Sequence, residues 1–312
     1  MKKLFVLLAT AALLASCATT PGDPTPQMEN DNTADENTAS ASVSSAPVQP
    51  SAYTLDALRA RSYGEGELSV EYAWENKENF TRYYITYPSD GLTIHGFVNI
   101  PLGKGPFPVI IALHGYIPPS EYTTRDYSTR YADALSDNGY IVLHPNMRNF
   151  PPSTFVSRTR DYQAGYVVDV LNLLALVRKM AGTEGIFKNA DMTRLGIWGH
   201  SLGGGVALRT VSILPEIKAA VIYAAVSQRY SSTEAGFPIF DYEFSQAAFS
   251  IHHGEDDDTI DLAWSERLNQ QLLEAGKQVE FFTYPNQPHT LFGQNDATFM
   301  RRMRLFYDSL LK

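Results

Sequence analysis

The sequence predicts an α/β fold built on a mostly parallel sheet of eight strands, with helices on both faces. Three observations predict it. Short apolar runs alternate with helix-forming segments along the 312-residue chain, and such alternation forms parallel sheets through right-handed crossovers. Two of the runs, 109–114 and 195–198, are apolar enough for strands buried on both faces. A glycine-rich turn comes after the second run and leads directly into a helix.

The expected elements can be placed in chain order. Residues 80–87 and 92–100 should form a hairpin around the turn Ser89-Asp90-Gly91. Period and composition place the other strands at 109–114, 140–143, 195–198, 219–225, 249–252 and 279–284. Helices are expected at 127–135, 167–180 and 202–214, after Asp258, and from about residue 297.

The turn after residues 195–198 has the spacing Gly199-x-Ser201-x-Gly203. A serine hydroxyl is a poor nucleophile until a tight turn exposes it beside a base. Glycines on either side leave room for strand and helix to approach each other. The motif is weak evidence alone, because three fixed positions also arise by chance. The hypothesis that Ser201 is a catalytic nucleophile therefore needs an acid and a base further along the chain.

Two further candidate groups come directly after predicted strands, at the edge where open α/β sheets place their sites. Residues 249–252 lead into His-Gly and the acidic run Glu255–Asp258. Residues 279–284 lead into a turn that ends at His289. The chain order is nucleophile, acid, histidine, which differs from the orders in chymotrypsin and subtilisin and predicts a Ser-His-Asp triad.

These motifs resemble those of the α/β-hydrolase superfamily. They are most similar to the catalytic domain of the prolyl oligopeptidase family and to the related dienelactone hydrolases and acetyl esterases. The resemblance runs from about residue 80 to the C-terminus and implies an α/β-hydrolase fold. Full-length prolyl oligopeptidases carry a large propeller, for which 312 residues leave no room, so no propeller is expected. A short lid is expected, because only residues 226–246 are available for it. The matching segments are Asp90–Gly96, Phe107–Tyr116, the Gly-His-Ser-Leu-Gly-Gly turn, His253-Gly254-x-x-Asp257-x-x-Ile260 and Tyr284-Pro285-x-x-x-His289.

The resemblance also implies roles for single residues. Ser201 is the expected nucleophile, His289 its base and Asp257 the orienting acid. Asp258 is then expected as the N-cap or first-turn acid of the next helix. The oxyanion hole is expected from the backbone N–H groups of Leu202 and Tyr116, with the Tyr116 hydroxyl as a second candidate for that contact.

The expected reaction is serine hydrolysis through an acyl-enzyme, on a small-molecule or short-peptide substrate. A prolyl oligopeptidase-like peptidase acting on short peptides is the first hypothesis, and a short-chain acyl or acetyl esterase is the alternative. A non-catalytic surface lipoprotein is the remote third. The substrate rim is expected in 117–126, 146–162 and 226–246. There Arg148, Arg158 and Arg160 either form surface pairs or hold a substrate carboxylate.

No cofactor or metal is expected, because the sequence has one cysteine and no His-Glu-x-x-His spacing. The net charge of −9, without a basic stripe, argues against a nucleic-acid partner. The oligomeric state is left open.

The N-terminus predicts a lipoprotein anchor. Residues 1–16 have the pattern of a secretory signal. Their end, Leu14-Ala15-Ser16-Cys17, resembles a bacterial lipoprotein box, so Cys17 is expected to carry lipid. A plain signal peptide with a chance cysteine is the alternative. Residues 17–52 lack aromatic and basic residues and are expected to form a disordered tether. The hydrolase domain is then 53–312, held at the bacterial cell envelope, on the outer membrane or cell surface.

Overall fold

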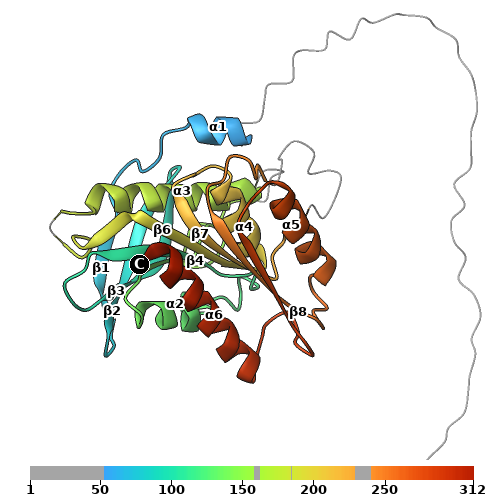
Figure 1. Ribbon diagram of the computed structural model, residues 1–312. Coiled ribbons are helices and arrows are strands. Elements are labelled where there is room, and N and C mark those ends of the chain that lie inside the picture. The colour runs from blue at the N-terminus through green and yellow to red at the C-terminus, as the bar shows by residue number, and fades with distance from the viewer. Residues whose placement is uncertain (1–52, 158–161, 184, 229–239) are drawn as a thin grey trace, which may run out of the picture. The chain divides into compact units, whose positions relative to one another are not determined.

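The computed structural model describes residues 53–157, 162–183, 185–228 and 240–312. Within these residues, nine strands form one sheet in the order β1-β2-β3-β5-β4-β6-β7-β8-β9 (Figure 1). The strands are β1 Ser69–Asn76, β2 Phe80–Ser89, β3 Leu92–Pro101, β4 Phe107–Leu113, β5 Ile141–Pro145, β6 Ala190–His200, β7 Ile217–Tyr223, β8 Ala248–Gly254 and β9 Val279–Tyr284. The helices are α1 Leu55–Ala60, α2 Thr129–Ser136, α3 Tyr162–Met180, α4 Leu202–Val211, α5 Leu262–Glu274 and α6 Gly293–Leu311.

Several sequence predictions lie outside the described residues. These are the signal and tether with Cys17, the two arginines Arg158 and Arg160, and most of the stretch 226–246. In the part of the chain that is described, no helix has the length and apolar character needed to cross a membrane.

The sheet has two parts with different strand directions. β1, β2 and β3 are antiparallel, and β3 also pairs with β5 in the antiparallel sense. The strands from β5 across to β9 pair in parallel. All eight expected strands are present, and the described sheet has one more, the edge strand β1. Most of its residues are exposed, so it lacks the buried apolar pattern that identifies the others.

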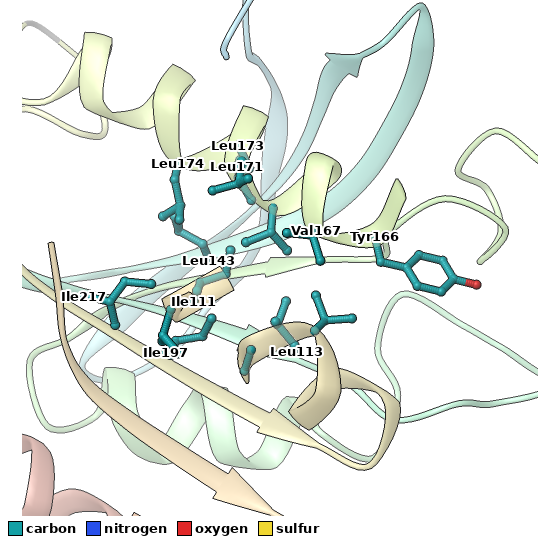
Figure 2. Packing of buried hydrophobic residues seen from close by; sticks show 14 of the residues in the cluster. Ile111, Leu113, Leu143, Tyr166, Val167, Leu171, Leu173, Leu174, Ile197 and Ile217 are labelled. Carbon is teal, nitrogen blue, oxygen red and sulfur yellow. The ribbon is translucent and has the colours of Figure 1, made fainter. Parts of the chain in front are cut away.

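The core is divided by the sheet into two layers. Successive residues of β4 alternate between them: Val109 and Ile111 pack with α3 and α4, whereas Ile110 packs with α2 and α6. Figure 2 shows the first layer, where Ile111 and Leu143 of adjacent strands point toward α3. Because both faces are covered, β4 is apolar over its whole length, and polar chemistry is expected in the loops at the carboxyl edge of the sheet.

One helix start differs from the expectation. The cap of α5 is Asp261, whose carboxylate accepts from the Ala263 N–H at 2.9 Å, and the expected cap Asp258 is exposed in the preceding turn. The reason is local. The N–H groups of Thr259 and Ile260 both donate to Asp257, which keeps the chain in a turn and delays the helix.

Candidate active site

Ser201 lies on a strained turn between β6, which ends at His200, and α4, which begins at Leu202. Its backbone has φ 54° and ψ −118°, a conformation that persists in a non-glycine residue only where its surroundings hold it. Two backbone hydrogen bonds do so. The Ser201 N–H donates to Tyr223 O at 2.9 Å, and the Ser201 carbonyl accepts from the Val226 N–H at 3.0 Å. The turn therefore fixes the serine at the carboxyl edge of the sheet.

The glycines of this turn are required by backbone contacts. A Cβ on Gly199 would lie 2.3 Å from the Gly203 carbonyl oxygen, and a Cβ on Gly203 would lie 2.2 Å from the Leu113 carbonyl oxygen. Both distances are far inside van der Waals contact. A larger residue at either position would push α4 away from β4 and β6.

Asp257 follows β8 and is the one acid of its run that reaches the candidate histidine. Its Oδ2 lies 2.7 Å from His289 Nδ1 and 3.1 Å from His253 Nε2. Its Oδ1 accepts from the N–H groups of Thr259 and Ile260, each at 2.9 Å. Burial alone would raise the pKa of this fully buried carboxyl, but the hydrogen bonds from His253, His289 and Ile260 hold the pKa well below its usual value.

His289 lies on the loop after β9, with its ring partly exposed. Because Nδ1 faces the Asp257 carboxylate, the neutral ring carries its proton there and leaves the Nε2 lone pair free to accept one. The loop is packed against the end of β8. A Cβ on Gly254 would lie 2.3 Å from the Gln287 carbonyl oxygen, and the Asp256 N–H donates to that oxygen at 2.9 Å.

The two expected oxyanion donors lie on either side of Ser201. Leu202 is the first residue of α4, so its N–H has no acceptor within the helix. Tyr116 follows Gly115, and a Cβ built on Gly115 would lie 3.1 Å from the Ser201 Cβ. The loop after β4 therefore runs directly beside the serine. The Tyr116 side chain is half exposed at this edge.

The expected rim is described in part. Arg148 is buried and its guanidinium is bound to Asp169, with Nη2 at 2.7 Å from Oδ1 and Nε at 3.0 Å from Oδ2. A role for Arg148 as an anchor for a substrate carboxylate is therefore wrong, because its donors point into the protein. In the same stretch Phe155 is exposed. Among the described residues, no group of three or more His, Cys, Asp or Glu side chains is arranged to hold a metal ion.

Two polar residues near the site were not assigned a role from the sequence. His200 contacts the backbone of His289 through Nε2 at 3.0 Å. Tyr127 was not singled out, and its hydroxyl bonds to His200 Nδ1 and to the Gly115 N–H. The position of His200 directly before Ser201 was the sequence feature that could have pointed to its place beside the site. Nothing in the sequence marks Tyr127, because its partners come from the loop after β4 and from the end of β6.

Comparisons with known proteins agree with this geometry. Residues 94–303 match the Dienelactone hydrolase family. A Synechocystis protein provisionally named a carboxymethylenebutenolidase is 22% identical over 229 residues, which cover 69% of this chain and 88% of that protein.

Solved structures with the same fold include esterases and peptidases. The acetyl xylan esterase from Paenibacillus sp. R4 has a TM-score of 0.63 and 16% identity, over 82% of this chain and 92% of the esterase. The acylaminoacyl peptidase of Pyrococcus horikoshii has a TM-score of 0.58 and 18% identity, over 76% of this chain and 43% of the peptidase. The chain thus spans less than half of that peptidase.

The mixed sheet, the serine turn and the relatives define an α/β hydrolase of the serine type, which confirms the fold class and the enzyme class predicted from the sequence. Within that class, the chain belongs to the dienelactone hydrolase family.

Proposed function

We propose that this enzyme hydrolyses small carboxylic esters, with Ser201 as nucleophile, His289 as general base and Asp257 as orienting acid. The observation that carries the proposal is the 2.7 Å hydrogen bond between Asp257 and His289 beside a strained serine turn. A base oriented by a buried carboxylate is the arrangement that activates a serine hydroxyl.

The proposed reaction has two acyl-transfer steps. The Ser201 Oγ attacks the carbonyl carbon while its proton passes to His289 Nε2, and the N–H groups of Leu202 and Tyr116 hold the oxyanion that forms. The C–O bond to the leaving alcohol then breaks, and His289 returns the proton to that alcohol. Water attacks the acyl-enzyme through the same base and releases the acid. The negative charge of Asp257 stabilises the imidazolium in both steps.

The extent of similarity supports an ester rather than a peptide as the substrate. The match covers 88% of the provisional carboxymethylenebutenolidase and 92% of the acetyl xylan esterase, two proteins named for ester hydrolysis. It covers 43% of the acylaminoacyl peptidase, so more than half of that protein has no counterpart in the match. Hydrolysis of short peptides is the second candidate, favoured by the shared fold with that peptidase.

The test compares acid release from unactivated alkyl esters and lactones with amine release from aminoacyl-proline amides, using the full chain. We expect turnover of an ester class and no release of amine. Amine release with a kcat/KM equal to that for esters would favour the peptidase. A protein that turns over neither class and does not react with a fluorophosphonate probe would favour the non-catalytic alternative.

Ser201→Ala is the matched control. It should lower kcat by about 10⁴-fold or more, because the residues of a triad act as a unit. It should also abolish fluorophosphonate labelling while leaving the thermal unfolding temperature close to that of the parent. Unchanged labelling would refute Ser201 as the nucleophile.

We also propose that residues 1–16 are a signal, that Cys17 carries lipid, and that residues 17–52 tether the domain 53–312 to a membrane of the cell envelope. The Leu-Ala-Ser-Cys sequence supports this. Multiple acyl chains hold a protein firmly, whereas a single chain binds marginally. Cys17→Ser should move the protein from the membrane fraction to the soluble fraction with kcat unchanged. A variant that stays in the membrane pellet would contradict the anchor.

A further inference from the structure

The proposed chemistry leaves one hydrogen-bonded chain beside the serine without a role. The Gly115 N–H donates to the Tyr127 hydroxyl at 2.8 Å. The same hydroxyl bonds to His200 Nδ1, and His200 Nε2 lies 3.0 Å from the carbonyl oxygen of His289. The chain therefore connects the loop after β4 to the loop after β9, through the residue directly before Ser201.

The proton positions in this chain are set by its two ends. A carbonyl oxygen only accepts, so His200 Nε2 must carry a proton and donate it to His289 O. Burial lowers the pKa of His200 to about 3, which keeps the ring neutral and leaves Nδ1 as an acceptor. The Tyr127 hydroxyl accepts from Gly115 and so donates to that nitrogen. Each donor in this hydrogen-bonded chain has one acceptor. Only the tautomer of His200 with its proton on Nε2 is compatible with these bonds.

Packing makes the contacts specific. His200 is 2% exposed, and its ring lies 4.2 Å from the Tyr223 ring and 4.6 Å from the His289 ring, measured between centroids. A Cβ on Gly115 would lie 2.7 Å from the Tyr127 hydroxyl oxygen. The loop after β4 can therefore approach Tyr127 this closely only with glycine at position 115.

We infer that Tyr127 and His200 are positioning residues that hold the loop bearing the Tyr116 N–H and the loop bearing His289 at fixed places on either side of Ser201. This inference rests on the proposed function, in which both loops supply groups to the reaction. One end of the chain is the residue before the proposed oxyanion donor, and the other end is the backbone of the proposed base. Neither Tyr127 nor His200 exchanges a proton with the substrate.

The first test is Tyr127→Phe, which removes one oxygen atom and breaks both bonds of the hydroxyl. We expect kcat on the best ester to fall about 10- to 100-fold with KM changed less than about threefold, because a small displacement of reacting groups lowers the rate more than binding. The rate of fluorophosphonate labelling at Ser201 should fall with kcat.

The matched control is Tyr307→Phe. The Tyr307 hydroxyl is buried and donates to Ile197 O at 2.6 Å, in the core and away from the reacting groups. Both substitutions remove one hydrogen-bonded hydroxyl, so both should lower the thermal unfolding temperature. Only Tyr127→Phe should lower kcat. Suppose that Tyr127→Phe lowers the unfolding temperature but has the same kcat as Tyr307→Phe. Tyr127 then has only a structural role, and the inference is wrong.

A second variant, His200→Asn, keeps an amide near the Tyr127 hydroxyl but does not reach His289 O. If the residues act as one chain, the double variant with Tyr127→Phe should be no slower than the slower single variant. Effects that multiply would overturn the inference. Ser201→Ala distinguishes failure of the proposed function from failure of the positioning role. If Ser201→Ala remains active, the proposed function fails. If it is inactive while Tyr127→Phe has the parent kcat, the positioning role alone fails.

Discussion

Two buried carboxylates, Asp169 and Asp257, occupy comparable positions and have different partners. Both side chains are fully buried at the carboxyl edge of the sheet or next to it. Asp169 on α3 is bound by the Arg148 guanidinium and by the Arg148 N–H, and it also accepts from Ser89 Oγ at 2.6 Å. The partners of Asp257 are two imidazoles and two backbone N–H groups.

These partners explain why one aspartate has a structural role and the other a proposed chemical role. Arginine is a permanent cation, so the charge of Asp169 is compensated in the resting protein and the pair fixes the loop after β5 to α3. The partners of Asp257 can all remain neutral. Its negative charge is left uncompensated until His289 accepts a proton, which is when the proposed reaction needs it.

The largest expected effect is that of Asp257→Asn. The amide can donate to His289 Nδ1 and so favours the wrong tautomer of the ring, which should lower kcat by about 10⁴-fold while the fold is retained. Steady-state kinetics and thermal unfolding measure the two quantities. Asp256→Asn and Asp258→Asn are the matched controls, since both side chains lie in the exposed turn. If Asp256→Asn were the inactive variant, the acid would have been assigned one residue away from its true position.

Asp169→Asn should have the opposite pattern. It removes the charge that pairs with buried Arg148 and should lower the free energy of unfolding by about 3 to 5 kcal/mol, because an unpaired buried charge remains. Among molecules that stay folded, kcat should equal that of the parent. Denaturant titration and kinetics below the transition give both values. A kcat loss as large as that of Asp257→Asn, with unfolding unchanged, would abolish the contrast between the two sites.

Acid should affect stability through Asp257. Its folded pKa lies below the unfolded value of about 3.9, so its stabilisation is complete above that value and is lost as the pH falls toward the folded pKa. Between pH 5 and pH 2 the free energy of unfolding of the parent should therefore fall by about 2 kcal/mol more than that of Asp257→Asn. Denaturant midpoints over this range measure it. Parallel curves for the two proteins would show that Asp257 does not gain its hydrogen bonds on folding.

The smallest expected effect is that of His253→Gln. His253 Nε2 lies 3.1 Å from Asp257 and 2.9 Å from Ile260 O, and its Nδ1 lies 2.7 Å from Ser265 Oγ. Because Asp257 retains three other donors, loss of this one should lower kcat by less than about 10-fold, the equivalent of one hydrogen bond. A loss approaching that of Asp257→Asn would mean that His253, rather than the backbone, sets the position of the carboxylate.

The sequence identified the parts of this protein whose requirements are local. The turn at Ser201 needs glycines two residues away on each side, and the contacts of Gly199 and Gly203 show why. The buried strands can be recognised in the sequence because both of their faces are covered and most of their residues are apolar. Strand β1 was not found, since an exposed edge strand has no such pattern.

The choice of polar partners was decided by tertiary structure alone. Arg148 resembled a surface or substrate-binding arginine until Asp169, from another element, was brought against it. Tyr127 had no signal at all, because its hydroxyl bonds to groups that lie 12 and 73 residues away in the chain. Backbone geometry and apolar burial produce a periodic pattern of residues in the sequence. A hydrogen bond between distant side chains does not, since any of many donors could meet any acceptor until the fold fixes which two are close.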